Sequence, residues 1–205
     1  ILHQFLSEIR DSKIQQDPLR FRRNMERIGE IMGYELSKTL EYSISETTTP
    51  LGVAQTSHIS DQIVLATILR AGLPLHTGLL NYFDRAQNAF VSAYRRNHKD
   101  NTFDIQIEYL SCPDITDKVL VISDPMLATG SSMVLAYQAL LKRGIPKHTH
   151  IISAIASRQG VDYCKKNLPP NVSIWLAAVD EELTAHAYIV PGLGDAGDLA
   201  YGEKI

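Results

Sequence analysis

Residues 119–132 combine an apolar stretch, an acidic residue and a run of small residues. Asp124 directly follows the apolar stretch 119–123, and the segment ends in Ala128, Thr129, Gly130, Ser131 and Ser132. Backbone N–H groups at the start of a helix are unpaired and carry partial positive charge, so they bind phosphate well. Small residues let a phosphate approach the backbone, and Asp124 would sit where open α/β sheets place their ligands. The segment therefore favours a phosphate-binding loop. A capped strand-to-helix turn without a ligand is the alternative, and the ending of a Walker loop is absent.

Two arginine-containing segments also follow predicted strands. Arg70-Ala71-Gly72 comes directly after the apolar run 63–69, and Arg95-Arg96-Asn97 follows the run 89–94. A guanidinium group is permanently charged and can bind two oxygens at once, which suits a diphosphate. For each segment, an ordinary ion pair at the end of a strand is the alternative.

The segment 188–198 is rich in glycine and contains Pro191, which indicates a tightly turned loop with exposed backbone. Main-chain N–H and C=O groups in such a loop can recognise the edge of a flat ring. A recognition group left unpaired costs about 1–3 kcal/mol, so this kind of contact is selective. A glycine-rich loop without a ligand is the alternative.

The hydrophobic pattern predicts that a mostly parallel sheet covered by helices positions these segments. Two polar strands around a turn at 50–52 and an arm or edge hairpin at 103–110 complete the expected elements. Arg20, Arg22 and Arg23 are interpreted as a solvated face. The expected strands of the sheet are 63–69, 89–94, 118–123, 148–156 and 172–179, and the expected helices are 20–42, 74–83, 132–143 and 159–167.

Length and composition fit one globular domain spanning 1–205, since the chain has 205 residues, 44% hydrophobic and 21% charged. The net charge of −3 argues against a nucleic-acid-binding face, and no apolar run is long enough to span a membrane. The first residues do not resemble a signal peptide, and the two cysteines, Cys112 and Cys164, are far apart. We therefore expect a cytoplasmic protein with neither membrane nor nucleic acid as a partner.

Four separated segments, in order, resemble one protein family, the uracil phosphoribosyltransferases among the type I phosphoribosyltransferases. The segment 124–132 is similar to that family's loop for phosphoribosyl pyrophosphate (PRPP), and 68–73 is similar to its pyrophosphate loop. The segment 93–97 resembles a second pyrophosphate-contacting stretch, and 188–198 resembles the uracil-recognition segment. Asp180, Leu183 and His186 match the approach to the last of these.

Two positions depart from the family pattern. Ser131 replaces the second glycine of the PRPP loop, which would be harmful if that position needs a positive φ angle. Arg96 is an extra residue beside Arg95, so either arginine could contact pyrophosphate, and Arg95 is the favoured one.

The resemblance implies a type I phosphoribosyltransferase fold with a β-arm at about 97–117 and a C-terminal base-binding hood at about 180–204. The implied reaction transfers the phosphoribosyl group of PRPP to uracil and gives UMP and pyrophosphate. Mg²⁺ would be carried by PRPP, with Asp195 as its candidate protein ligand. The implied catalytic residues are Arg70, Arg95 and Asp124. The implied PRPP-binding residues are Arg70, Arg95, Asp124, Pro125, Met126, Leu127, Ala128, Thr129, Gly130, Ser131, Ser132 and Asp195. The implied uracil-binding residues are Ile189, Gly194, Asp195 and Ala196.

The same resemblance implies a homo-oligomer, either a dimer or a tetramer, and some family members are activated by GTP. Three other functions stay open at this point. The protein could be a purine or orotate phosphoribosyltransferase, a regulatory relative that senses UMP or PRPP, or a catalytically silent homologue.

Overall fold

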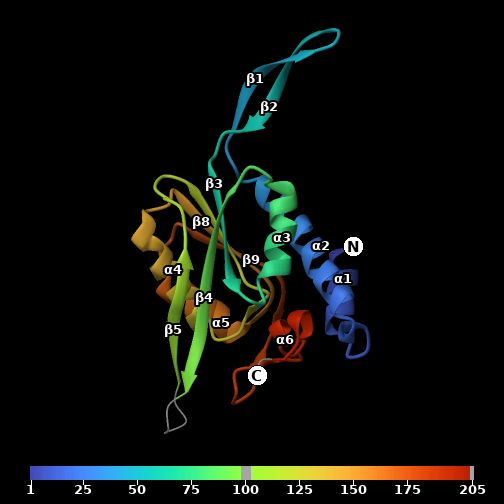
Figure 1. Ribbon diagram of the computed structural model, residues 1–205, viewed down its shortest axis with the longest axis vertical. Helices are drawn as coiled ribbons and strands as arrows, with labels where there is room; N and C mark the ends of the chain where they lie inside the picture. The colour runs from blue at the N-terminus through green and yellow to red at the C-terminus, as the bar shows by residue number, and fades with distance from the viewer. Residues whose placement is uncertain (98–102, 204–205) are drawn as a thin grey trace.

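A seven-stranded sheet forms the centre of the computed structural model, which describes residues 1–97 and 103–203 apart from the side chains at 93–97 and 103–106 (Figure 1). The strand order is β5-β4-β3-β6-β8-β7, and β9 also pairs with β8. Among the long strands the pairing is parallel, except that the edge strand β5 runs antiparallel to β4. The strands are β3 Ile63–Leu69, β4 Gln87–Asn97, β5 Phe103–Ser111, β6 Val119–Ser123, β7 Met126–Leu127, β8 His148–Ser157 and β9 Val172–Asp180. The predicted α/β class with a mostly parallel sheet is confirmed.

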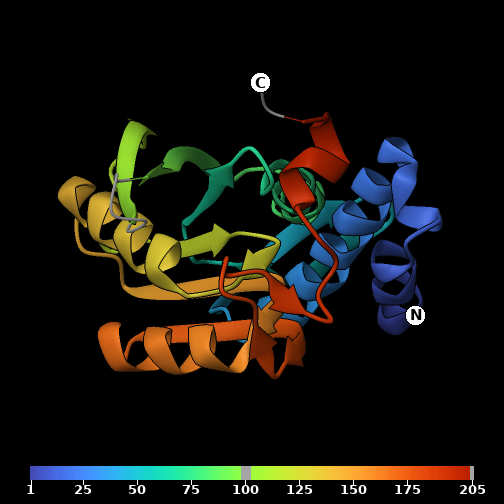
Figure 2. The ribbon, with the colours of Figure 1, turned by 90° about the horizontal axis from the view of Figure 1, so that it is seen from below.

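Helices cover both faces of this sheet (Figure 2). Apolar side chains of β3 alternate between the faces: Leu65 joins the core under α1, α2 and α3, while Val64 joins the core under α4 and α5. None of the described helices is long and apolar enough to cross a membrane. The helices are α1 Leu2–Arg10, α2 Pro18–Ser37, α3 Leu73–Tyr82, α4 Ser131–Leu140, α5 Arg158–Asn167 and α6 Ala196–Tyr201, with short 3-10 turns at Ile14–Gln16 and Leu141–Arg143.

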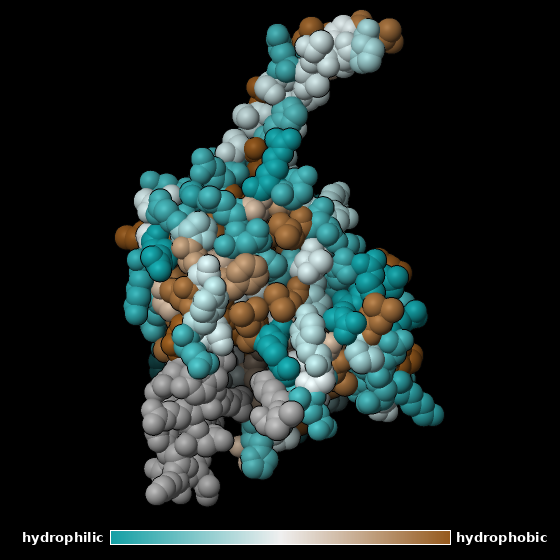
Figure 3. All heavy atoms as spheres, in the orientation of Figure 1, coloured by the Kyte–Doolittle hydropathy of each residue, from teal (hydrophilic) through white to brown (hydrophobic). Residues whose placement is uncertain are grey.

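Two further strands, β1 Tyr42–Thr49 and β2 Gly52–Ile59, form an antiparallel ribbon that projects from the body (Figure 1). The ribbon matches the two polar strands predicted around residues 50–52. Apolar side chains are exposed on it, as the brown spheres near its tip show (Figure 3). Ile44, Leu51 and Val53 are 76%, 101% and 64% exposed.

The helices begin and end where capping residues place them, and not where the apolar pattern begins and ends. The helix predicted at 20–42 runs from Pro18 to Ser37 because Asp17 caps it, accepting hydrogen bonds from the N–H groups of Leu19 and Arg20. The predicted helix at 132–143 is an α-helix only to Leu140, and a 3-10 turn completes it. Sequence analysis predicted neither α1 nor α6, and the pairs β10 Glu182–Leu183 and β11 Ile189–Val190 were not expected either.

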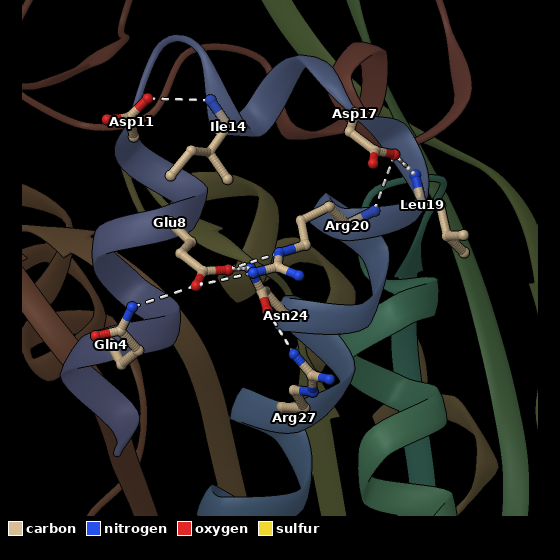
Figure 4. A network of polar contacts seen from close by, with 9 residues as sticks. All are labelled: Gln4, Glu8, Asp11, Ile14, Asp17, Leu19, Arg20, Asn24 and Arg27. Carbon is tan, nitrogen blue, oxygen red and sulfur yellow. Dashed lines mark hydrogen bonds and ion pairs between the residues drawn. The ribbon is translucent and has the colours of Figure 1, made fainter.

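The prediction of a solvated face holds for Arg20 and Arg23, whose side chains are half exposed, but not for Arg22, which is partly buried against α6. Arg20 donates to the carboxylate of Glu8, joining α1 to α2 in the network of Figure 4. Hydrogen bonds from Arg20, Asn24 and Gln4 lower the pKa of Glu8 to about 2. Arg22 donates to the carbonyl oxygen of Ala200 at 2.6 Å. The two arginines therefore attach α1 and the C-terminal helix α6 to α2.

Candidate active site

A cavity of about 440 Å³ opens at the carboxyl ends of the parallel strands. Three stretches of chain that are far apart in sequence form its wall: the turn after β3, the segment from the end of β6 into α4, and the C-terminal segment. Gly130 and Asp195 line the same cavity. The lining residues are Leu69, Arg70, Ala71, Asp124, Pro125, Met126, Leu127, Ala128, Thr129, Gly130, Ser132, Met133, His186, Ala187, Tyr188, Asp195 and Gly197.

The segment 124–130 is fixed from behind by β8. Met126 and Leu127 form the short strand β7, which pairs in parallel with Ile155 and Ala156. The N–H of Asp124 donates to Ile152 at 3.1 Å, and the carbonyl oxygen of Pro125 accepts from Ile155 at 3.0 Å. These main-chain bonds hold the loop against the sheet, so its inner surface faces the cavity.

Gly130 ends this loop with φ +78° and is the N-cap residue of α4, so the cap position offers no side chain, and the Thr129 hydroxyl accepts from the Ser131 N–H at 3.4 Å. A Cβ atom at this position would lie 2.7 Å from the carbonyl oxygen of Gly160 and 3.0 Å from the sulfur of Cys164. Only glycine fits this conformation and this close approach. An uncapped helix N-terminus beside a cavity suits an anion such as a phosphate.

The backbone conformation at position 131 does not require the glycine that the family pattern has there. Ser131 is the first residue of α4, and the positive φ angle belongs to Gly130. The hydroxyl groups of Ser131 and Thr129 are 2.6 Å apart. Ser131 is absent from the cavity wall, whereas Ser132 is part of it.

Arg70 lies directly after β3, and the peptide bond between Leu69 and Arg70 is cis. Its Nη2 donates to the Asp198 carboxylate at 3.3 Å and to the Gly202 carbonyl oxygen at 3.1 Å. Its Nε is buried and has no hydrogen-bond partner. A buried N–H donor without a partner is costly, so this guanidinium group is suited to accept an anionic ligand.

Asp124 lines the cavity, and the pKa of its side chain is raised far above its ordinary value. Burial raises the pKa of its carboxyl group to about 7, and a hydrogen bond from the N–H of Met126 offsets only part of that effect. Carboxyl groups with strongly shifted pKa values are common at functional sites, because burial and neighbouring charges there adjust the pKa to the chemistry. The surroundings of Asp124 therefore favour the protonated form of its carboxyl group.

Asp124→Asn is expected to stabilise the folded protein at about pH 8 by about 2–4 kcal/mol. The folded-state pKa lies above the unfolded value of 3.8, so folding takes up a proton and stability falls as pH rises from about 4 to about 7. Urea unfolding of both proteins checks this, and the difference should nearly vanish at about pH 4. Equal stability of the two proteins at pH 8 would contradict the expectation.

The C-terminal segment reaches the cavity through Tyr188, Asp195 and Gly197. Asp195 caps α6, since its Oδ1 accepts from the N–H groups of Gly197 at 2.8 Å and Asp198 at 3.0 Å. Ile189 and Ala196 are buried, and Gly194 is exposed with φ +94°. These three residues are absent from the cavity wall, although each has a neighbour in sequence that lines it.

The predicted pyrophosphate contact at Arg95, or at Arg96 beside it, concerns side chains outside the described part of the structure. Both residues belong to β4, where they pair with Ile105 and Asp104 of β5. The tip of the predicted β-arm, residues 98–102, also lies outside the described residues.

Carboxylate oxygens at the cavity would suit Mg²⁺, which binds oxygen ligands and keeps several of its waters. Asp124 and Asp195 both supply such groups at the cavity wall. Within residues 1–97 and 103–203, no group of three or more His, Cys, Asp or Glu side chains is arranged to hold a metal. The rings of His148 and His150 are in contact, with centroids 4.6 Å apart and planes tilted by 47°, and the Nδ1 of His150 accepts from Trp175.

Several wall residues were not predicted individually. His186 and Tyr188 were noticed only as parts of matching segments, and Ala187, with φ +62°, was not singled out. Leu69, Ala71, Met133 and Gly197 complete this set. Leu69 and Ala71 flank Arg70, Met133 follows Ser132, and Gly197 follows Ala196, so proximity in sequence to a predicted site residue is the signal that could have identified these four.

Solved structures of phosphoribosyltransferases share this fold. A protein from Aquifex aeolicus superposes with a TM-score of 0.89 at 30% identity, covering 100% of this chain and 95% of that one. A hypoxanthine phosphoribosyltransferase from Staphylococcus aureus, at 14% identity, superposes with a TM-score of 0.53 over 79% of this chain and 76% of that one. The fold is that of the type I phosphoribosyltransferases.

Relatives in sequence point to one family among the proteins with this fold. Residues 1–203 match the family described as uracil phosphoribosyltransferase. A uracil phosphoribosyltransferase from Porphyromonas gingivalis is 62% identical over 205 residues, covering 100% of this chain and 95% of that protein. One from Methanothermobacter thermautotrophicus is 42% identical, covering 91% of this chain and 86% of that protein. The chain belongs to the uracil phosphoribosyltransferase family.

Proposed function

We propose that this protein transfers the phosphoribosyl group of PRPP to uracil, forming UMP and pyrophosphate. The observation that carries the proposal is the single cavity that joins the 124–130 loop, Arg70 and the C-terminal segment. Each of these matches a family segment with a different ligand: the 5′-phosphate, the pyrophosphate and the base. The 62% identity to a relative that carries this name supports the same reaction here.

In this proposal the uncapped N-terminus of α4 binds the 5′-phosphate and Asp124 binds the ribose hydroxyls. The C–O bond to pyrophosphate weakens as the anomeric carbon gains oxocarbenium character, as at other glycosidic centres. Arg70 stabilises the charge that develops on the leaving pyrophosphate, with Arg95 as its predicted partner. Pyrophosphate leaves with the electron pair of the broken C–O bond, the ring nitrogen N1 of uracil forms the new bond to the anomeric carbon, and the N1 proton is released to water or to the pyrophosphate.

Base recognition is assigned to the segment 188–197, which contributes Tyr188, Asp195 and Gly197 to the cavity wall. The proposed uracil contacts are at Ile189, Gly194, Asp195 and Ala196. Mg²⁺ would neutralise charge on the diphosphate when bound with PRPP, and Asp195 or Asp124 would be its protein ligands. Asp195 has its Oδ1 engaged as a helix cap, so its other oxygen is the one suited to that role.

The proposal is tested by incubating the protein with PRPP, Mg²⁺ and one base at a time, followed by chromatography. UMP should form from uracil, and adenine, hypoxanthine and orotate should give at most about 1% of that rate, since unmatched polar groups cost several kcal/mol together. Preferred turnover of another base would overturn the substrate assignment. Tight UMP binding with no pyrophosphate release would favour the regulatory alternative.

We also propose a cytoplasmic homo-oligomer in which the whole chain acts as one domain. The exposed apolar side chains on the β1–β2 ribbon support assembly, since isolated two-stranded ribbons are marginal in water. Light scattering after size-exclusion chromatography would measure the state, and a monomer at all concentrations would contradict it.

A further inference from the structure

Two neighbouring residues at the carboxyl edge of the sheet each hold a different half of the candidate active site. Ser157 is the last residue of β8 and Asp180 is the last residue of β9, and the two are directly paired in the parallel register. Ser157 is fully buried and Asp180 is 9% exposed. Neither residue lines the cavity.

Ser157 fixes the loop that we assign to PRPP. Its hydroxyl donates to the carbonyl oxygen of Ala128 at 2.5 Å and accepts from the N–H of Gly160 at 2.8 Å. One hydroxyl therefore caps α5 and ties the loop to it. Cys164 of the same helix donates weakly to the Gly130 carbonyl oxygen at 3.7 Å. Loss of the Ser157 hydroxyl would release Ala128, two residues before the glycine at the start of α4.

Asp180 fixes the segment that we assign to the base, together with Arg10 of α1. Arg10 binds the Asp180 carboxylate through both Nη atoms, at 2.8 and 2.9 Å. The same Nη1 donates to the carbonyl oxygen of Gly192 at 3.1 Å, and the N–H of Gly192 donates to Asp180 at 3.0 Å. Both main-chain polar groups of Gly192 are thus held by this pair. Gly192 lies between the wall residues Tyr188 and Asp195.

We propose that Ser157 is a positioning residue for PRPP, and that Arg10 with Asp180 positions the segment that recognises the base. This inference rests on the proposed function and assigns its two substrates to separate anchors. The two anchors connect to helices on different faces of the sheet. Asp180 binds Arg10 of α1, whose Ile9 belongs to one core, and Ser157 caps α5, whose Val161 belongs to the other. Damage to one anchor should therefore impair one substrate.

The test is a crossed kinetic comparison. Ser157→Ala is expected to raise the KM for PRPP about tenfold and leave the KM for uracil within about twofold. Arg10→Gln and Asp180→Asn are expected to do the reverse, with uracil titrated at saturating PRPP. Ser157→Thr keeps the hydroxyl group and should restore most of the affinity for PRPP.

Matched controls come from neighbouring residues. Ser153→Ala removes a buried hydroxyl of the same strand that donates to the carbonyl oxygen of Ile155 at 3.0 Å. Arg158→Gln removes an exposed pair with Glu181, next to Asp180 in sequence. Both controls should keep both KM values within about twofold, because exposed pairs and local contacts contribute little. Thermal unfolding of every variant separates a general loss of stability from the substrate-specific effect.

Equal increases in both KM values in Ser157→Ala and Arg10→Gln would overturn the inference, and so would unchanged values in both. If Arg10→Gln does not fold, the isosteric Asp180→Asn decides the same question. Turnover by the unmodified protein tests the proposed function separately. Calorimetric binding of PRPP with Mg²⁺ keeps the inference testable without turnover, since Ser157→Ala should weaken that binding about tenfold and Arg10→Gln should not.

Discussion

Arg70→Gln is expected to lower kcat/KM by about 100- to 1000-fold, the usual effect of removing one donor from developing transition-state charge. Glutamine keeps length and polarity but loses the permanent charge and the paired donors of guanidinium. The buried Nε without a partner and the Nη2 held by Asp198 place that group at the cavity wall. Steady-state release of pyrophosphate with uracil and PRPP measures the loss.

Two companion variants separate the role of Arg70 in catalysis from its contacts in the protein. Arg70→Lys keeps the charge and should retain intermediate activity, because lysine cannot bind two oxygens in the same planar arrangement. Arg158→Gln removes another arginine that has one carboxylate partner, and its kcat/KM should equal that of the unmodified protein. Activity of Arg70→Gln within about threefold of the unmodified protein would contradict the assigned role.

Gly130→Ala should lower kcat/KM by a similar factor, because it strains the backbone of the loop. A non-glycine residue at φ +78° is strained, and its Cβ would meet the Gly160 carbonyl oxygen and the Cys164 sulfur at 2.7 and 3.0 Å. We expect a loss of about 2–3 kcal/mol in the free energy of unfolding and at least about a 100-fold loss of kcat/KM for PRPP. Urea unfolding and steady-state kinetics measure the two effects.

Ser131→Gly is the matched control, because it restores the family's glycine at the adjacent position. Residue 131 is helical and absent from the cavity wall, so the change should alter activity by no more than about threefold. The helix should lose about 0.5–1 kcal/mol in stability, as glycine is a poor helix former. A large activity gain in Ser131→Gly, or a fully active Gly130→Ala, would show that the glycine requirement has been placed at the wrong residue.

The sheet could be predicted because its strands are continuous apolar runs. Residues 63–69 form β3 with the predicted bounds, and 119–123 form β6. Such runs are typical of strands buried on both faces, which leaves few other structures for them. The fold class followed from the order of strands and helices along the chain.

The helix α6 could not be predicted from local pattern, whereas α1 has a pattern that was missed, with Leu2, Phe5, Leu6 and Ile9 at three- and four-residue spacing. α6 is six residues long and depends on the cap at Asp195 and on contacts with α2, including the bond from Arg22 to Ala200. The strand β7 has only two residues, so its pairing with β8 is a tertiary property. Short elements of this kind are defined by partners that are distant in sequence.

The residues of the candidate site could be predicted from the sequence where the type of side chain alone indicates its chemical role. Asp124, Arg70 and Gly130 stand out as an acid, a cation and a flexible turn at strand ends, and the structure brings all three to one cavity with Asp195. Ser157 and Arg10 carry no such signal. Their importance depends on hydrogen bonds to Ala128 and Gly192, which only the folded structure reveals.

The separate anchoring of the two cavity walls has an evolutionary consequence. If the C-terminal segment recognises the base as proposed, mutations near it can change which flat ring is accepted while the loop at 124–130 keeps its own supports in β8 and α5. Selection can thus explore new acceptor specificities without first rebuilding the grip on the donor sugar. A scaffold divided in this way is suited to diversify, and a hypoxanthine phosphoribosyltransferase with only 14% identity still shares its architecture.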